Sequence, residues 1–292
     1  MKPASFEYFA PTSLEEALER VAEVGNEGGK ILAGGQSLIP AMNFRLAQPA
    51  YLIDLNRIPE LFYINPAPNG DILVGTMSRD STIEKSKEVG AVVPMLHECL
   101  PFIGHPQIRN RGTIGGAIAH GDPAGQIPVV AVAQNFGLHI KSKSMDRWVD
   151  AENFYTSMYT NVLEADEMLV EIRLPKLPAH SGTSYKQMAR QTGASALVGV
   201  ATMLSLDADE ICTNARVVFL GIGEIPVLSK VIPDALRGQK VNEALILDAV
   251  DTCVSDELDP GQDMHATSDF RRHLSRVLGK SALLESLARA KK

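Results

Sequence analysis

Two glycine-rich stretches constrain this chain more than any other feature of its sequence. Residues 31–38 read Ile-Leu-Ala-Gly-Gly-Gln-Ser-Leu, and residues 109–123 read Arg-Asn-Arg-Gly-Thr-Ile-Gly-Gly-Ala-Ile-Ala-His-Gly-Asp-Pro. Glycine has no Cβ, so its backbone N–H can approach a ligand closely, and successive exposed N–H groups bind anions. A plain tight turn is the alternative interpretation of the first stretch. Because the same pattern recurs, the sequence predicts two loops that close on a diphosphate from both sides.

The composition is that of an ordinary globular protein. The 292 residues suffice for two or three domains, and 45% of them are hydrophobic and 22% charged. A net charge of −7 argues against a nucleic-acid partner, which would need a basic face. Residues 1–10 do not read as a secretory signal, and no stretch approaches the roughly 20 apolar residues of a membrane span. We therefore expect a cytoplasmic location.

The spacing of cysteine and histidine predicts no metal site. Cys99, Cys212 and Cys253 lie far apart, so this chain alone cannot form a four-cysteine iron–sulfur cluster or a disulfide framework. Free cysteines of this kind are typical of an apolar interior. The histidines are scattered and form no His-Glu-x-x-His helix.

The first half of the chain alternates short helices and strands. Ser13, with Glu16 three residues later, predicts the start of a helix. Asn69 followed by Gly70 predicts a hairpin, because this pair supplies positive φ at low cost. Further strands are expected at 30–33, 51–55, 71–76 and 138–141, helices at 39–46 and 94–99 and one that begins with residues 82–84, and a buried helix or strand at 127–136.

A domain boundary is expected at residues 175–182, where two prolines lie close together. Before this boundary, residues 167–174 alternate in polarity and predict a strand. After it, runs of strand length at 183–190, 196–207 and 214–221 precede helical patterns at 242–254 and 268–290. This order predicts an α+β fold for the C-terminal part.

Several separate motifs resemble the FAD-binding medium subunit of the molybdenum hydroxylases, the family of carbon monoxide dehydrogenase and xanthine dehydrogenase. They lie at residues 33–40, 45–46, 52–55, 106–116 and 269–272, so the resemblance covers essentially the whole chain. It implies an α+β protein whose residues 1–177 form a PCMH-type FAD-binding domain of two α/β subdomains, 1–57 and 58–177. Residues 178–292 would form a C-terminal flavoprotein domain of the carbon monoxide dehydrogenase type.

The resemblance also implies which residues bind FAD. The two glycine stretches would hold the diphosphate through backbone N–H groups, and Thr113 would add a hydroxyl donor. Ile103 lies where the family places a wall against the adenine, and Gly121, Asp122 and Gln126 lie in the segment that meets the adenosine. The implied diphosphate contacts are Ala33, Gly34, Gly35, Gln36, Ser37, Thr113, Ile114, Gly115, Gly116 and Ala117.

Three positions differ from what related flavoproteins carry. Gln126 stands where the family usually has an acidic residue, and its amide oxygen can accept a bond from a ribose hydroxyl without charge assistance. Ala117 stands where Asn or Ser is common and lacks their polar contact. Gln36 stands where related flavoproteins can attach FAD through a histidine. Because Gln36 has no nucleophile, we expect non-covalent FAD.

Four side chains nearer the C-terminus are candidates for contact with the flavin ring. Lys186 and Arg190 would place a cation near the ring, where it would stabilise reduced anionic flavin; the alternative is a solvated strand face. Val170 and Ile172 would line the apolar side of the ring; the alternative is ordinary strand core.

By resemblance, this chain is the electron-exit subunit of a three-component molybdenum hydroxylase. A molybdopterin large subunit would hydroxylate the substrate, and a small subunit with two [2Fe–2S] clusters would relay electrons to FAD, from which an external acceptor would take them. The cofactor carries the redox chemistry, so no residue is named as catalytic. The implied assembly is a dimer of heterotrimers. A flavin-free scaffold subunit and a stand-alone flavin oxidase are the alternatives.

Overall fold

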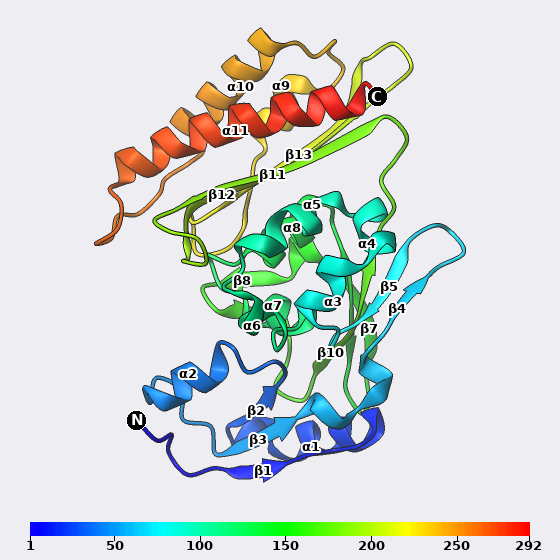
Figure 1. Ribbon diagram of the computed structural model, residues 1–292, viewed down its shortest axis with the longest axis vertical. Coiled ribbons are helices and arrows are strands. Elements are labelled where there is room, and N and C mark those ends of the chain that lie inside the picture. Colours follow the sequence, from blue (N-terminus) through cyan, green and yellow to red (C-terminus); the bar gives the residue numbers. More distant parts are fainter.

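Three larger sheets follow one another along the length of the molecule (Figure 1). The computed structural model describes residues 1–292. The N-terminus lies at the end formed by the first sheet, and the C-terminus lies beside the third sheet at the opposite end. The predicted α+β class is confirmed. No helix combines the length and the apolar character that crossing a membrane requires.

The first sheet is parallel, with the order β1-β3-β2. The start of α1 is as predicted, because the Ser13 hydroxyl accepts a hydrogen bond from the Glu16 N–H at 3.2 Å. β2 and β3 are neighbours and end at the same edge, where the first glycine stretch begins. The elements are β1 (Glu7–Phe9), α1 (Leu14–Val24), β2 (Gly29–Leu32), α2 (Leu38–Asn43) and β3 (Tyr51–Asp54).

The second sheet is antiparallel, with the order β4-β5-β10-β6-β7. The hairpin predicted at Asn69-Gly70 joins β4 to β5, and Gly70 has a φ of 89°. The strands are β4 (Ile64–Pro66), β5 (Ile72–Gly75), β6 (Gly137–Lys141), β7 (Asp146–Asp150) and β10 (Met168–Leu174). A separate pair, β8 (Tyr155–Ser157) and β9 (Thr160–Asn161), forms a small ribbon.

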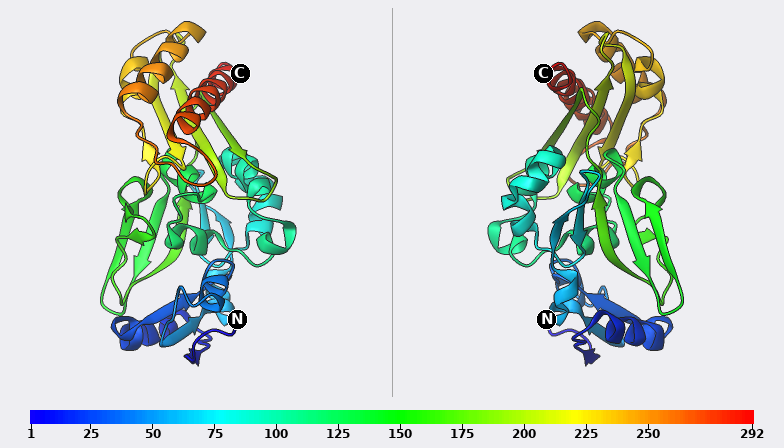
Figure 2. Two further views of the ribbon diagram at one scale, coloured as in Figure 1. Left: turned by 90° about the vertical axis from the view of Figure 1, so that its left-hand side faces the viewer. Right: turned by 90° about the vertical axis from the view of Figure 1, so that its right-hand side faces the viewer.

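Short helices gather on one side of the second sheet (Figure 2). They bury a large apolar core against the sheet, with Phe136 and Phe154 among its largest fully buried side chains. They are α3 (Asp80–Lys85), α4 (Lys87–Val92), α5 (Pro94–Cys99), α6 (Pro106–Arg109), α7 (Ile114–His120) and α8 (Gln126–Ala133).

The second glycine stretch contains the start of helix α7 rather than only the loop that the sequence predicts. The Thr113 hydroxyl accepts a hydrogen bond from the Gly116 N–H at 3.1 Å and so caps the helix. Glycine is a poor helix former, but Ile114 and Ile118 are fully buried in the core of the second sheet. Burial of these two side chains therefore outweighs the low helix propensity of the glycines.

The third sheet is antiparallel, with the order β11-β12-β13-β14. Helix α11 covers one face, and α5 and α8 of the preceding part cover the other. Because both faces are covered, β12 is buried along its whole length. The elements are β11 (Ser181–Ala189), β12 (Ala196–Leu206), β13 (Cys212–Leu220), β14 (Val227–Leu228), α9 (Val231–Leu236), α10 (Glu243–Asp256) and α11 (Ser268–Ala290).

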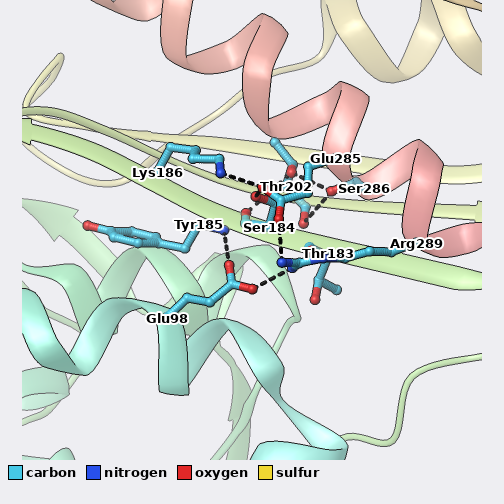
Figure 3. Close-up of polar contacts among 9 residues, drawn as sticks. All are labelled: Glu98, Thr183, Ser184, Tyr185, Lys186, Thr202, Glu285, Ser286 and Arg289. Carbon is cyan, nitrogen blue, oxygen red and sulfur yellow. Dashed lines mark hydrogen bonds and ion pairs between the residues drawn. The ribbon is translucent and has the colours of Figure 1, made fainter.

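A polar cluster ties α11 and β11 to α5 (Figure 3). The Glu98 carboxylate accepts a hydrogen bond from the Tyr185 N–H at 2.7 Å and pairs with the Arg289 guanidinium. The same guanidinium donates to the Thr183 carbonyl. A single carboxylate on α5 therefore contacts both the third sheet and its covering helix.

Candidate cofactor site

A pocket of about 390 Å³ opens at the edge where β2 and β3 end. Ligands of sheets with parallel strands commonly bind outside the carboxyl ends of the strands. Arg111, from the second glycine stretch, faces the first stretch across this pocket. The lining residues are Leu32, Ala33, Gly34, Gly35, Gln36, Ile39, Pro40, Asp54, Asn56 and Arg111.

Residues 34–37, which we call the nest, offer unpaired backbone donors. None of their four N–H groups donates a hydrogen bond to an atom of the chain. Gly34 is buried, and a buried donor without a partner costs about 1–3 kcal/mol. Gly35 has a φ of 74°, which glycine adopts at little cost. Successive free N–H groups of this kind form an anion-binding concavity, so the nest fits a phosphate or diphosphate.

The second glycine stretch packs directly against the nest. A Cβ on Gly34 would lie 2.2 Å from the Arg111 carbonyl oxygen, and a Cβ on Gly116 would lie 3.2 Å from the Ala33 Cβ. A Cβ on Gly115 would lie 1.6 Å from the Thr76 hydroxyl oxygen. Glycine is therefore required at these positions so that the segments can approach one another.

In the second stretch, the N–H groups of residues 114–117 are already used within the chain. Those of residues 114–117 donate to the Ser78 carbonyl, the Thr76 carbonyl, the Thr113 hydroxyl and the Thr113 carbonyl, at 3.0–3.2 Å. The Thr113 N–H, one residue before this run, donates to no atom of the chain. The two stretches meet as expected, but the free donors lie almost entirely on the first.

Arg79, between β5 and α3, links the two stretches. Its Nη1 donates to the Arg111 carbonyl and its Nη2 donates to the Asn56 Oδ1, both at 2.5 Å. Asn56 Nδ2 in turn donates to the Ala33 carbonyl at 2.8 Å. Burial and, next, the charge of Arg111 lower the pKa of Arg79, which reflects two guanidinium groups close together. The Arg79–Asn56 link therefore holds the nest and places positive charge beside it.

Asp54 is the carboxylate in the pocket lining, and its oxygens are occupied. Oδ2 accepts from the Tyr8 hydroxyl at 2.6 Å, and Oδ1 accepts from the Asn56 N–H at 2.9 Å. The hydrogen bond to Asp54 raises the pKa of Tyr8, ahead of its burial. Asp54 thus orients Asn56 within the pocket lining.

Sequence reasoning did not single out Asp54, Asn56 or Arg79 as site residues. A usable indication existed for the first two, because they follow a strand that neighbours β2 and ends at the same edge. Arg79 carried no such indication, since its contact with the nest depends on how the second sheet sits beside the first.

Three further predicted residues lie outside this pocket. Gly121 ends α7 with a φ of 62°, and the Asp122 Oδ1 accepts from the Ala124 N–H at 2.8 Å. Ile103 is half-buried against the core of the second sheet. Its carbonyl accepts from Arg109, which also binds Glu84 through two hydrogen bonds of 2.8 and 3.1 Å.

Gln126 begins α8 and reaches the third sheet. It is 8% exposed, and its Nε2 donates to the Gln187 Oε1 at 3.2 Å. The Tyr185 hydroxyl donates to the same Gln187 oxygen at 2.5 Å. The Gln126 oxygen has no partner in the chain, so it can still accept a hydrogen bond.

Val170 and Ile172 are both buried in hydrophobic cores. Val170 is 4% exposed and packs in the core of the first sheet, whereas Ile172 is fully buried in that of the second. These placements correspond to the strand-core alternative for both residues.

Lys186 points away from the part of the chain that carries the pocket. Its ammonium pairs with Glu285 of α11, on the face of the third sheet that α11 covers (Figure 3). Side chains alternate along a strand, so the neighbours Tyr185 and Gln187 face the opposite way, toward the second sheet and its helices. Lys186 therefore faces α11 in this chain, and its contact with the flavin ring stays a prediction.

Two family models match the chain in succession. "FAD binding domain in molybdopterin dehydrogenase" matches residues 4–177, and "CO dehydrogenase flavoprotein C-terminal domain" matches residues 183–286. The 6-hydroxypseudooxynicotine dehydrogenase complex subunit alpha of Paenarthrobacter nicotinovorans is 34% identical, over 100% of this chain and 97% of that protein. The carbon monoxide dehydrogenase medium chain of Hydrogenophaga pseudoflava is 32% identical, over 99% of each.

Solved structures agree over the whole chain. A chain of carbon monoxide dehydrogenase from Hydrogenophaga pseudoflava superposes with a TM-score of 0.94 at 34% identity, covering 99% of each chain. A chain of quinoline 2-oxidoreductase from Pseudomonas putida 86 superposes with a TM-score of 0.92 at 32% identity, covering 100% of each. This chain therefore belongs to the family of FAD-binding medium subunits of the molybdenum hydroxylases, and its cofactor is FAD.

Proposed function

We propose that this chain is the FAD-binding, electron-exit subunit of a three-component molybdenum hydroxylase. Electrons would reach it from the [2Fe–2S] clusters of a small subunit, after hydroxylation at molybdopterin in a large subunit, and would leave to an external acceptor. Bound FAD supplies the redox chemistry, because it accepts electrons one or two at a time. Family membership supports the proposal, and so does the naming of several relatives as subunits or chains of larger enzymes. We infer a dimer of heterotrimers on the same grounds.

The observation that carries the proposal is the run of four unpaired N–H groups in residues 34–37. They would bind the FAD diphosphate, with Ser37 as a further donor. The Arg79–Asn56 link holds them open before the ligand arrives, which lowers the entropic cost of binding. The Thr113 hydroxyl oxygen accepts a hydrogen bond from the Gly116 N–H, and its own O–H stays free to donate to the diphosphate.

The rest of the cofactor would extend from the nest toward the third sheet. Gly121, Asp122 and Gln126 would meet the adenosine, with the free Gln126 oxygen accepting a bond from a ribose hydroxyl. Ile103 would stand against the adenine. Val170 and Ile172 would contribute only through the walls that they support, since both are buried. Lys186 is left out of the proposed site.

Attachment of FAD is proposed to be non-covalent. Gln36, at the position where related flavoproteins can carry an attaching histidine, has an amide that donates from Nε2 to the Gly34 carbonyl at 3.0 Å. An amide is not a nucleophile under physiological conditions, so it forms no bond to the flavin. Its role is to shape the nest.

The test is the absorbance spectrum of the complex purified with its partner subunits, followed by acid precipitation. Free FAD in the supernatant is the expected result and supports both the flavin and its non-covalent attachment. Flavin retained in the pellet would refute non-covalent attachment. An intact complex that contains molybdenum and iron but no flavin would refute the electron-exit role in favour of a scaffold. Substrate oxidation by the flavin-loaded chain alone would favour a stand-alone oxidase.

A further inference from the structure

We propose that the guanidinium of Arg111 is the charged contact for the FAD diphosphate and makes FAD binding depend on ionic strength. This inference rests on the proposed function. The backbone nest alone supplies only partial positive charge, whereas a diphosphate between two esters carries two negative charges. A full cation beside the nest would complete the neutralisation.

The hydrogen-bond partners of the charged side chains at the pocket identify Arg111 as the candidate contact. Asp54 and Arg111 are the charged residues that line it. The oxygens of Asp54 are engaged by Tyr8 and Asn56. The guanidinium of Arg79, behind the lining, is engaged by Asn56 and by the Arg111 carbonyl. Arg111 is the charged lining residue whose side chain has no hydrogen-bond partner.

The Arg111 side chain is exposed and makes no hydrogen bond or ion pair in the chain. Its backbone, by contrast, is fixed. Its carbonyl accepts from Arg79 at 2.5 Å, and the same oxygen lies where a Cβ on Gly34 would be only 2.2 Å away. A fixed backbone beside Gly34 with a free side chain is the arrangement of a residue that can close over a ligand held by the nest.

A guanidinium suits this role chemically. It presents planar paired donors that match two phosphate oxygens, and its charge persists at any physiological pH. Burial and, next, the charge of Arg111 lower the pKa of Arg79, so the two guanidinium groups interact. An anion bound there would relieve the repulsion between the two guanidinium groups.

The test is reconstitution of the flavin-depleted complex with FAD, followed by the quenching of flavin fluorescence at low and high sodium chloride. The variants are Arg111→Gln and Arg111→Lys. Arg237→Gln is the matched control, because Arg237 is exposed and lies in the region of the third sheet. This substitution removes the same charge as Arg111→Gln. Riboflavin is the matched ligand control, because it has the same ring but no diphosphate.

We expect Arg111→Gln to weaken FAD binding about tenfold at low salt, the scale of one charge-assisted hydrogen bond, and to flatten its salt dependence. Arg111→Lys should keep the salt dependence while binding more weakly than wild type. Riboflavin binding should be equal in all variants. Wild-type affinity and salt dependence in Arg111→Gln would overturn the inference while leaving the proposed function intact. Failure of the wild-type complex to bind FAD would overturn both.

Discussion

The two glycine stretches have similar sequences but different physical roles. In the nest, residues 34–37, all four N–H groups are free. In residues 114–117, every N–H group is paired within the chain. Glycine serves backbone conformation and ligand access in the first case and close packing in the second. A glycine pair therefore does not by itself indicate a ligand site. Its N–H groups can bind a ligand only if they have no hydrogen-bond partner within the chain.

This difference divides the site into a binding part and a supporting part. Arg79 joins them through the Arg111 carbonyl and Asn56, so the supporting stretch fixes the shape of the binding one. Substitutions in the second stretch should act first on folding stability, and substitutions in the first should act on FAD affinity.

The largest effect is expected for Gly115→Ala. The new Cβ would lie 1.6 Å from the Thr76 hydroxyl oxygen and 2.6 Å from the Thr76 carbonyl oxygen, so the start of α7 must move away from β5. We expect the free energy of unfolding to fall by about 3 kcal/mol or more, as in severe overpacking. Chemical denaturation measures it. Gly261→Ala is the control, since its Cβ meets nothing within 4 Å. Equal stability of the two variants would contradict the packing role.

A pH-dependent effect is expected for Asp80→Asn, beside the second stretch. Burial raises the pKa of Asp80 to about 7, and its Oδ1 has no hydrogen-bond partner. The Asp80 Oδ2 occupies the space beside Gly112, where a Cβ would be 2.2 Å away. The carboxyl is therefore held most favourably in its neutral form.

The raised pKa of Asp80 determines how the stability of the fold changes with pH. An acid whose pKa is raised on folding contributes stability below its unfolded pKa of 3.8, and this contribution is lost as pH rises through about 7. An Asn side chain does not titrate. The stability of Asp80→Asn relative to wild type should therefore rise by several kcal/mol between acidic pH and pH above 7, at about 1.4 kcal/mol for each unit of the pKa shift. Thermal unfolding at several pH values measures it; a difference that does not change with pH would contradict the buried neutral acid.

A smaller and more selective effect is expected for Gly35→Ala in the nest. Gly35 and Gly238 have φ values of 74° and 75°, so alanine should cost each site about 1–2 kcal/mol of backbone strain. Only Gly35 lies in the nest. Gly35→Ala should therefore also weaken FAD binding about tenfold through lost N–H geometry, while Gly238→Ala should leave FAD affinity unchanged. Flavin titration of both depleted complexes checks this. Equal affinities would remove the nest from the site.

Much of the fold was accessible from the sequence because local patterns and tertiary demands agree. Ser13 and Glu16 mark the helix start that the structure has, and Asn69-Gly70 marks the hairpin. The three long runs after residue 182 became β11, β12 and β13. The start of α7 was missed because the glycine content indicates a loop. The helix forms because it buries Ile114 and Ile118 in the core.

The site was only partly accessible for a physical reason. The nest follows directly from residues 33–37, but the groups that hold it come from distant positions. Arg79 is 46 residues from residue 33 in sequence and is joined to it through Asn56. Such contacts depend on the placement of one sheet against another, which local patterns do not specify. The orientation of a single strand residue has the same limit, since the sequence does not show that the Lys186 side chain faces α11.

Lys186 gives the smallest expected effect. It lies on the α11 face of β11 and pairs with Glu285, whereas Gln187, one residue later, reaches Gln126 on the other face. Lys186→Met should lower the free energy of unfolding by less than about 1 kcal/mol, because the pair is partly exposed. The reduction potential and affinity of the flavin should not change. Gln187→Met is the matched variant and should weaken FAD binding, since it removes the acceptor that orients the Gln126 amide. A shifted flavin potential in Lys186→Met alone would return this lysine to the site, and would mean that the third sheet presents its other face to the cofactor.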